Sequence, residues 1–243
     1  MNPEVNTTDQ HTHQPADTHR PRPHSFIVKT ARMLSAVFSP LIIPTYCTVL
    51  AMWLTPLSQY PEGPRFMASL IVFALTAAFP LLIILSMMRM GRVSNLDISR
   101  RSQRLLPLMM ILVCYILATI YIYRQVHSGA SSNYWWLVMY FVSGCVTTLA
   151  VALISTRWKI SGHGAAMGNL VGMLAALIEG NHADVDLLPW LCTAILLAGA
   201  VGSARIILHR HTIAQVIAGI ALSTIITAVL MTCHPLAKLI ITN

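Results

Sequence analysis

Acidic side chains are scarce in this sequence. Asp and Glu together number eight among 243 residues, and none lies in the middle of an apolar run. Transferases that hold an activated lipid through Mg²⁺ need clustered carboxylates, and proton-coupled transporters usually place ionisable groups at mid-membrane. The sequence offers neither pattern, and it predicts no metal site and no cofactor.

The sequence also lacks a cysteine motif and contains few charged residues. The five cysteines form no CxxC or Cys/His pattern and lie in or beside apolar runs, so we interpret them as small core residues. Charged residues make up 10% of the chain and hydrophobic residues 56%, with a mean hydropathy of +0.66. A soluble domain could not cover so much apolar surface. The composition therefore indicates a membrane protein.

Apolar runs of about 20 residues, the length that spans hydrocarbon, recur along the chain. We count about seven and expect an all-α, polytopic transmembrane helix bundle. The predicted parts are a disordered polar tail (1–33), N-terminal transmembrane helices (34–88) and a catalytic core of transmembrane helices (89–235). The expected spans are 34–58, 66–88, 105–123, 134–156, 163–178, 187–208 and 213–232.

Basic residues are distributed unevenly between the two ends of this predicted bundle. Of the 16 Lys and Arg residues, all except Arg65, Arg124 and Lys238 fall on the side that holds the N-terminus. Positive loops usually face the cytoplasm, so the net charge of +8 reports topology rather than nucleic-acid binding. We expect a multi-pass protein of a bacterial-type inner (plasma) membrane, in contact with membrane lipids.

A first candidate site element joins the fourth and fifth expected spans. If residues 157–161 are extended, the side chains of Arg157, Lys159 and Ser161 point the same way. Ser161 would cap the next helix, whose free amides favour a phosphate, and Gly162 would let the backbone approach a ligand. This segment predicts an anion site with His163 at its rim.

A second element lies between the sixth and seventh expected spans. His211 and Gln215 are four residues apart, so they share a helix face, and Gln215 can accept a hydrogen bond from one imidazole N–H. The other nitrogen could attack phosphorus, while a second histidine protonates the leaving oxygen. Arg205 could neutralise charge on the transferring phosphoryl group.

A third element lies on the same side, between the second and third expected spans. Arg101 and Arg104 are three residues apart and are neighbours if the segment is helical. Arginine suits bidentate contact with phosphate. We therefore predict that both arginines bind phosphate.

From about residue 89 to residue 220, the chain resembles the type 2 phosphatidic acid phosphatase superfamily, which includes acid phosphatases and haloperoxidases. The Ser-Gly-His motif that supplies the general acid in that family is similar to Ser161–His163. The last family motif is Ser-Arg, five residues, His, three residues and Asp; Arg205 and His211 fit its spacing. The resemblance implies His211 as the nucleophile.

Two positions and one motif depart from the family pattern. Ala204 stands in place of Ser and Gln215 in place of Asp, and the first family motif is absent, with Arg101, Arg104 and Lys159 as the expected substitutes. Gln215 can orient an imidazole, but it cannot stabilise an imidazolium by charge.

Taken with the resemblance, these residues imply a metal-independent lipid phosphatase. It would act through a phosphohistidine on a polyprenyl phosphate or diphosphate, phosphatidic acid or a similar lipid phosphate. The departures keep open a protein that binds lipid phosphates without hydrolysing them. A third alternative is a haloperoxidase that requires vanadate.

Overall fold

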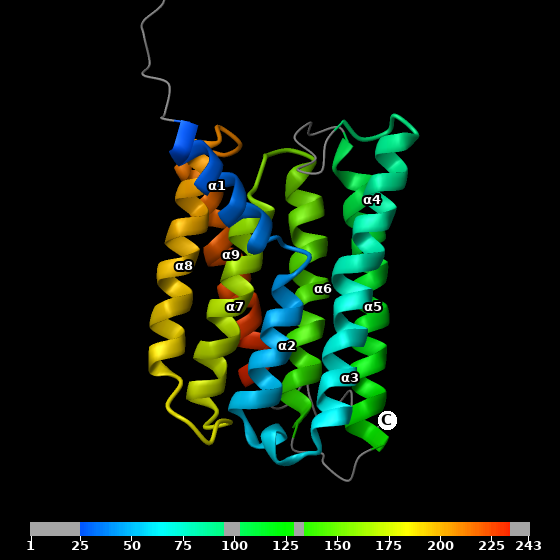
Figure 1. The fold of residues 1–243 in the computed structure, drawn as a ribbon, viewed down its shortest axis with the longest axis vertical. Helices are drawn as coiled ribbons and strands as arrows, with labels where there is room; N and C mark the ends of the chain where they lie inside the picture. Colours follow the sequence, from blue (N-terminus) through cyan, green and yellow to red (C-terminus); the bar gives the residue numbers. More distant parts are fainter. Residues whose placement is uncertain (1–24, 95–102, 129–133, 234–243) are drawn as a thin grey trace, which may run out of the picture.

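The computed structural model describes residues 25–94, 103–128 and 134–233, and all regular structure within these ranges is helical. This confirms the predicted all-α class for these residues. The helices form an elongated bundle (Figure 1). In chain order they are α1 (Ser25–Val37), α2 (Ile43–Leu54), the 3-10 helix η1 (Pro56–Gln59), α3 (Glu62–Phe73), the π-helical turn η2 (Ala74–Ala78), α4 (Phe79–Arg89), α5 (Leu105–Ser128), α6 (Trp135–Ser155), α7 (Gly162–Glu179), α8 (Leu188–Ile207) and α9 (Ile213–Thr232).

Five helices in the described ranges are long and apolar enough to cross a membrane: the continuous helix Glu62–Arg89, then Leu105–His127, α6, α8 and α9. The prediction of about seven spans is therefore not confirmed. The expected span 34–58 is interrupted around Pro40, and the apolar helix that follows it, α2, has only 12 residues. The expected fifth span, α7, carries His163 and Asn169 among its glycines and is largely buried inside the bundle.

Helix α1 corrects the predicted polar tail, which extended to residue 33. The segment 1–24 lies outside the described residues, but residues 25–33 are helical. Ala31 and Ser35, four residues apart on one face of this helix, are buried, whereas Phe26, Lys29 and Met33 are exposed. This helix crosses obliquely over one end of the bundle, close to the ends of the longer helices (Figure 1).

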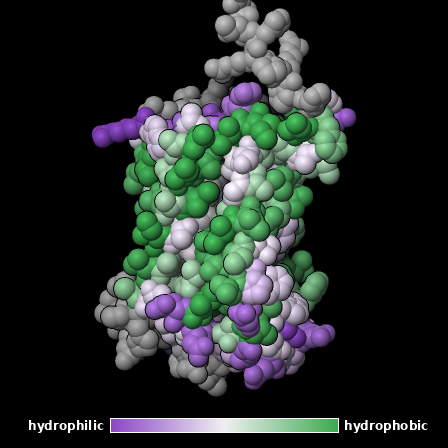
Figure 2. Space-filling model, turned by 90° about the vertical axis from the view of Figure 1, so that its left-hand side faces the viewer, coloured by the Kyte–Doolittle hydropathy of each residue, from purple (hydrophilic) through white to green (hydrophobic). Residues whose placement is uncertain are grey.

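On the face seen in Figure 2, a broad apolar band covers the middle of the molecule, with polar side chains at both ends. Large apolar side chains on the outer faces of the long helices are exposed, among them Leu82, Leu117, Leu196 and Ile217. Helices that satisfy their own backbone groups and expose such side chains are suited to lipid. The long apolar helices and this band indicate a membrane protein.

Helices α6, α7 and α9 pack against one another. A Cβ added to Gly164 of α7 would lie 2.7 Å from the carbonyl oxygen of Val216 in α9, so only glycine permits this approach. The side-chain oxygen of Asn169 accepts hydrogen bonds from Thr147 of α6 (3.3 Å) and Thr227 of α9 (2.8 Å). These contacts hold the three helices in a defined register.

Candidate active site

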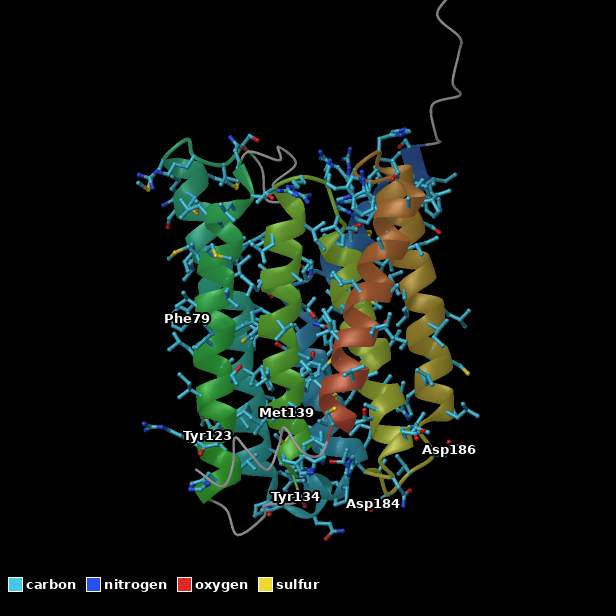
Figure 3. All side chains as sticks on the ribbon, turned by 180° about the vertical axis from the view of Figure 1, so that it is seen from behind. Phe79, Tyr123, Tyr134, Met139, Asp184 and Asp186 are labelled. Carbon is cyan, nitrogen blue, oxygen red and sulfur yellow. The ribbon has the colours of Figure 1, made fainter. Side chains whose placement is uncertain are left out.

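Three helix junctions lie together at one end of the bundle: the start of α5, the α6–α7 connection and the α8–α9 connection (Figure 1). Nitrogen-bearing side chains gather at this end, whereas Asp184 and Asp186 lie at the opposite end (Figure 3). The three predicted site elements therefore share one end of the molecule, as far as the described residues include them. Arg101 falls outside those residues.

A cavity of about 840 Å³ opens beside these junctions. The part of its wall formed by the junctions consists of Arg104, Gly162, His163, Arg205 and His211. The rest of the wall is mainly apolar and comes from α1, the α1–α2 turn, the α3–α4 helix and α5. The cavity thus places a cationic, histidine-containing surface next to a much larger apolar one.

His211 is oriented by Gln215, as their spacing predicts. The Gln215 Oε1 atom accepts a hydrogen bond from the backbone N–H of Thr212 at 3.2 Å, and Nδ1 of His211 lies 3.1 Å from the same oxygen. Because a carbonyl oxygen only accepts, Nδ1 of His211 must carry the proton. In the neutral ring, Nε2 is then the nitrogen with a lone pair.

The surroundings of His211 favour its neutral form. The side chain is 8% exposed. Burial, and secondarily the positive charges of Arg104, Lys159 and Arg205, lower the pKa of His211 to about 4, although the hydrogen bond to Gln215 acts in the opposite direction. At neutral pH, His211 is therefore an uncharged imidazole beside several cations.

The turn that ends α8 positions Arg205. Arg205 is 2% exposed and lines the cavity. His209 has a φ of 51°, the left-handed conformation that closes many helices, and the Arg210 N–H donates to the Arg205 carbonyl at 3.0 Å. This turn could not be predicted from the sequence, because glycine usually occupies the left-handed position that His209 occupies here. The turn places His211 immediately after the helix end that carries Arg205.

Ser161 caps α7 as expected, since its side chain accepts a hydrogen bond from the Gly164 N–H at 3.1 Å. A Cβ added to Gly162 would meet no atom within 4 Å, and Gly162 faces the cavity, so a ligand can approach its backbone. The extended segment is shorter than predicted: Arg157 lies in a turn after α6, with its N–H bonded to the Ile154 carbonyl, and does not align with Ser161.

Two cations flank this junction. The guanidinium of Arg104, 7% exposed, donates from Nη1 to the Ile160 carbonyl at 3.0 Å and so links the start of α5 to the segment before α7. Lys159 is half-buried and lies close enough for its charge to affect His211. The structure therefore brings Arg104, Lys159, Arg205 and both histidines to one region.

His163 has a partner that sequence reasoning missed. Its Nε2 lies 3.0 Å from the backbone carbonyl oxygen of Ser35 in α1, 128 residues earlier in the chain. No local pattern could reveal this contact, because a backbone carbonyl has no sequence signature. Helix α1 is therefore part of the site.

A model of the PAP2 superfamily matches residues 147–238, which include both histidines. This match confirms the resemblance to the type 2 phosphatidic acid phosphatase superfamily over these residues. Searches of curated proteins and of solved structures found no match.

Proposed function

We propose that this chain, whose residues 147–238 match the PAP2 superfamily, is an integral membrane lipid phosphatase that acts through a phosphohistidine on His211. The proposal rests chiefly on one observation: a neutral His211, with Nδ1 bound to Gln215, shares a cavity wall with His163, Arg104 and Arg205. Such a set can attack phosphorus, protonate a leaving group and neutralise phosphoryl charge.

In the first step, Nε2 of His211 attacks phosphorus and the bond from phosphorus to the lipid oxygen breaks. His163 gives its proton to that oxygen, so the lipid alcohol or phosphate leaves in protonated form. Water then attacks the phosphohistidine and passes a proton to His163. Inorganic phosphate leaves, and both histidines return to their starting states.

The phosphoryl group would be held by cations and backbone amides. Arg104 and Arg205 line the cavity, and Lys159 contributes further positive charge near His211. The start of α7 adds amides and the positive end of a helix dipole. Because these groups can neutralise the phosphate, we propose that the reaction needs no metal ion.

A lipid substrate is supported by the apolar part of the cavity. A phosphate would occupy only a small part of about 840 Å³. Leu81 and Ile84 of α4, with Leu108 and Ile111 of α5, offer a surface suited to a hydrocarbon chain. The substrate would place its phosphate at the histidines and its chain between these helices.

Gln215 sets the expected limit on rate. A carboxylate at this position would stabilise the imidazolium that develops at His211, whereas the neutral amide orients the ring without adding charge. We therefore expect slow turnover. Binding without hydrolysis is the alternative that the same residue favours.

The deciding experiment is phosphate release by the detergent-purified protein from a panel of lipid phosphates in EDTA. We expect wild type to release phosphate, His211→Ala to release none, and radioactive phosphate to be trapped on wild type after an acid-free quench. Binding of lipid phosphates without release from any of them would contradict hydrolysis and support the binding alternative.

A further inference from the structure

We infer that the backbone carbonyl of Ser35 in α1 positions His163 for proton transfer, an inference that rests on the proposed phosphatase function. The observation is the 3.0 Å approach of His163 Nε2 to this oxygen. Ser35 would orient His163 as Gln215 orients His211, because in each case a neutral oxygen holds one ring nitrogen. The other nitrogen attacks phosphorus in His211 and exchanges a proton in His163.

The Ser35 carbonyl is available because α1 ends two residues later. In a continuing helix it would accept from the N–H of residue 39. Here the Ser39 N–H bonds to the Ala36 carbonyl at 3.3 Å instead, and the chain turns toward Pro40. The end of α1 therefore presents an acceptor to the cavity.

The chemistry of this contact defines the roles of the two ring nitrogens. Because the carbonyl only accepts, Nε2 of His163 carries a proton in both the charged and the neutral ring. When the charged ring donates to the leaving oxygen, the proton must come from Nδ1, and the neutral Nε2–H tautomer remains. Nδ1 then takes the proton of the attacking water, which restores the charged ring.

Further features of α1 support its place in the site. Ser35 is buried, and its hydroxyl has no hydrogen-bond partner within the described part of the chain, yet the residue lines the cavity. Arg32, one turn earlier, lines the same cavity. Helix α1 lies far outside the residues 147–238 matched to the superfamily, so this contribution belongs to this chain's own N-terminal part.

The test compares Ala36→Pro with Ala36→Val. Proline at position 36 disfavours the helical conformation of Ser35 and turns its carbonyl away. Valine has the same number of side-chain heavy atoms as proline and leaves the backbone in place. Because Ala36 is exposed and lines the cavity, Ala36→Val also controls for the atoms that proline adds there. The measured quantity is kcat/KM for a series of substituted phenyl phosphates whose leaving phenols differ in acidity.

We expect Ala36→Pro to lower kcat/KM by about 100-fold for the least acidic leaving group, within the usual range for general acid catalysis. The p-nitrophenyl ester, whose leaving group needs little protonation, should change by only a few-fold. Ala36→Val should keep the wild-type dependence on leaving group. A uniform loss across the series, or no loss, in Ala36→Pro would overturn the inference.

A second variant tests the inference if Ala36→Pro does not fold. Lactic acid in place of Ala36 converts the Ser35 carbonyl to an ester, a weaker acceptor, without adding atoms to the cavity. We expect a smaller change in the same direction, and an unchanged dependence on leaving group would refute the inference. Failure of wild type to hydrolyse any ester of the series would instead count against the proposed function itself.

Discussion

The backbone carbonyl of Gln215 accepts a hydrogen bond from the N–H of Ser161 at 3.2 Å. This contact joins the start of α9 to the start of α7, so the helices that carry His211 and His163 meet directly. A Cβ on Gly219 would lie 2.6 Å from the Ser161 carbonyl oxygen, so the close approach depends on glycine. The distance between the two histidines is thus set by helix packing.

Gly219→Ala should therefore disturb both stability and activity. We expect it to destabilise the protein by about 1–3 kcal/mol, because atoms of the α7 backbone must move apart from α9, and to lower phosphate release. Gly199→Ala on the outer face of α8 is the control, since a Cβ there meets nothing within 4 Å. Thermal unfolding in detergent measures the difference, and equal unfolding temperatures would contradict this account of the packing.

The pH dependence of kcat/KM should report the neutral state of His211. Because its pKa is lowered to about 4, activity should persist through mildly acidic pH and fall only as pH drops through that value. Gln215→Glu keeps the side-chain length and adds a negative charge, which favours the imidazolium and raises the pKa. The acid limb should move to higher pH, and the rate at neutral pH should increase.

The pH profiles of wild type and Gln215→Glu are both measured with p-nitrophenyl phosphate. Because the ionisation of this substrate is the same for both proteins, a difference between the two profiles arises from a group of the enzyme. An acid limb at the same pH in wild type and Gln215→Glu would show that the titrating group is not His211.

Arg104 should have a structural as well as an electrostatic role. Arg104→Met removes the hydrogen bond to the Ile160 carbonyl and one cation from the site. We expect a loss of about 1–3 kcal/mol of stability and at least about a tenfold rise in KM. Arg124 is exposed near the opposite end of α5, and Arg124→Met should change neither the stability nor KM. A normal KM in Arg104→Met would remove this residue from the phosphate site.

The apolar wall should select for a hydrocarbon chain. Ala78 lines the cavity at the π-helical turn, so Ala78→Phe should fill space that a chain needs. We expect turnover of a long-chain lipid phosphate to fall about tenfold or more, while p-nitrophenyl phosphate is hydrolysed at the wild-type rate. Leu82→Phe, exposed on the outer face of the same helix, should affect neither. Equal loss on both substrates in Ala78→Phe would argue against a chain-binding wall.

Features that depend on neighbouring residues along the chain could be predicted from the sequence. Apolar runs predicted membrane helices, although the expected span 34–58 is divided into the short helices α1 and α2, and α7 is not among the candidate spans. The spacing of four residues predicted the contact between His211 and Gln215, and the Ser161 cap followed from its position before α7. These are interactions within one helical turn, so a local pattern specifies them.

The assembly of the site could not be predicted from local sequence patterns. The contacts from Ser161 to Gln215, from Arg104 to Ile160 and from His163 to Ser35 join residues 54, 56 and 128 positions apart. In each, a backbone carbonyl is the acceptor, and every residue carries one. Which carbonyl meets which donor depends on how closely the helices pack, and glycines in the α7–α9 interface permit that packing.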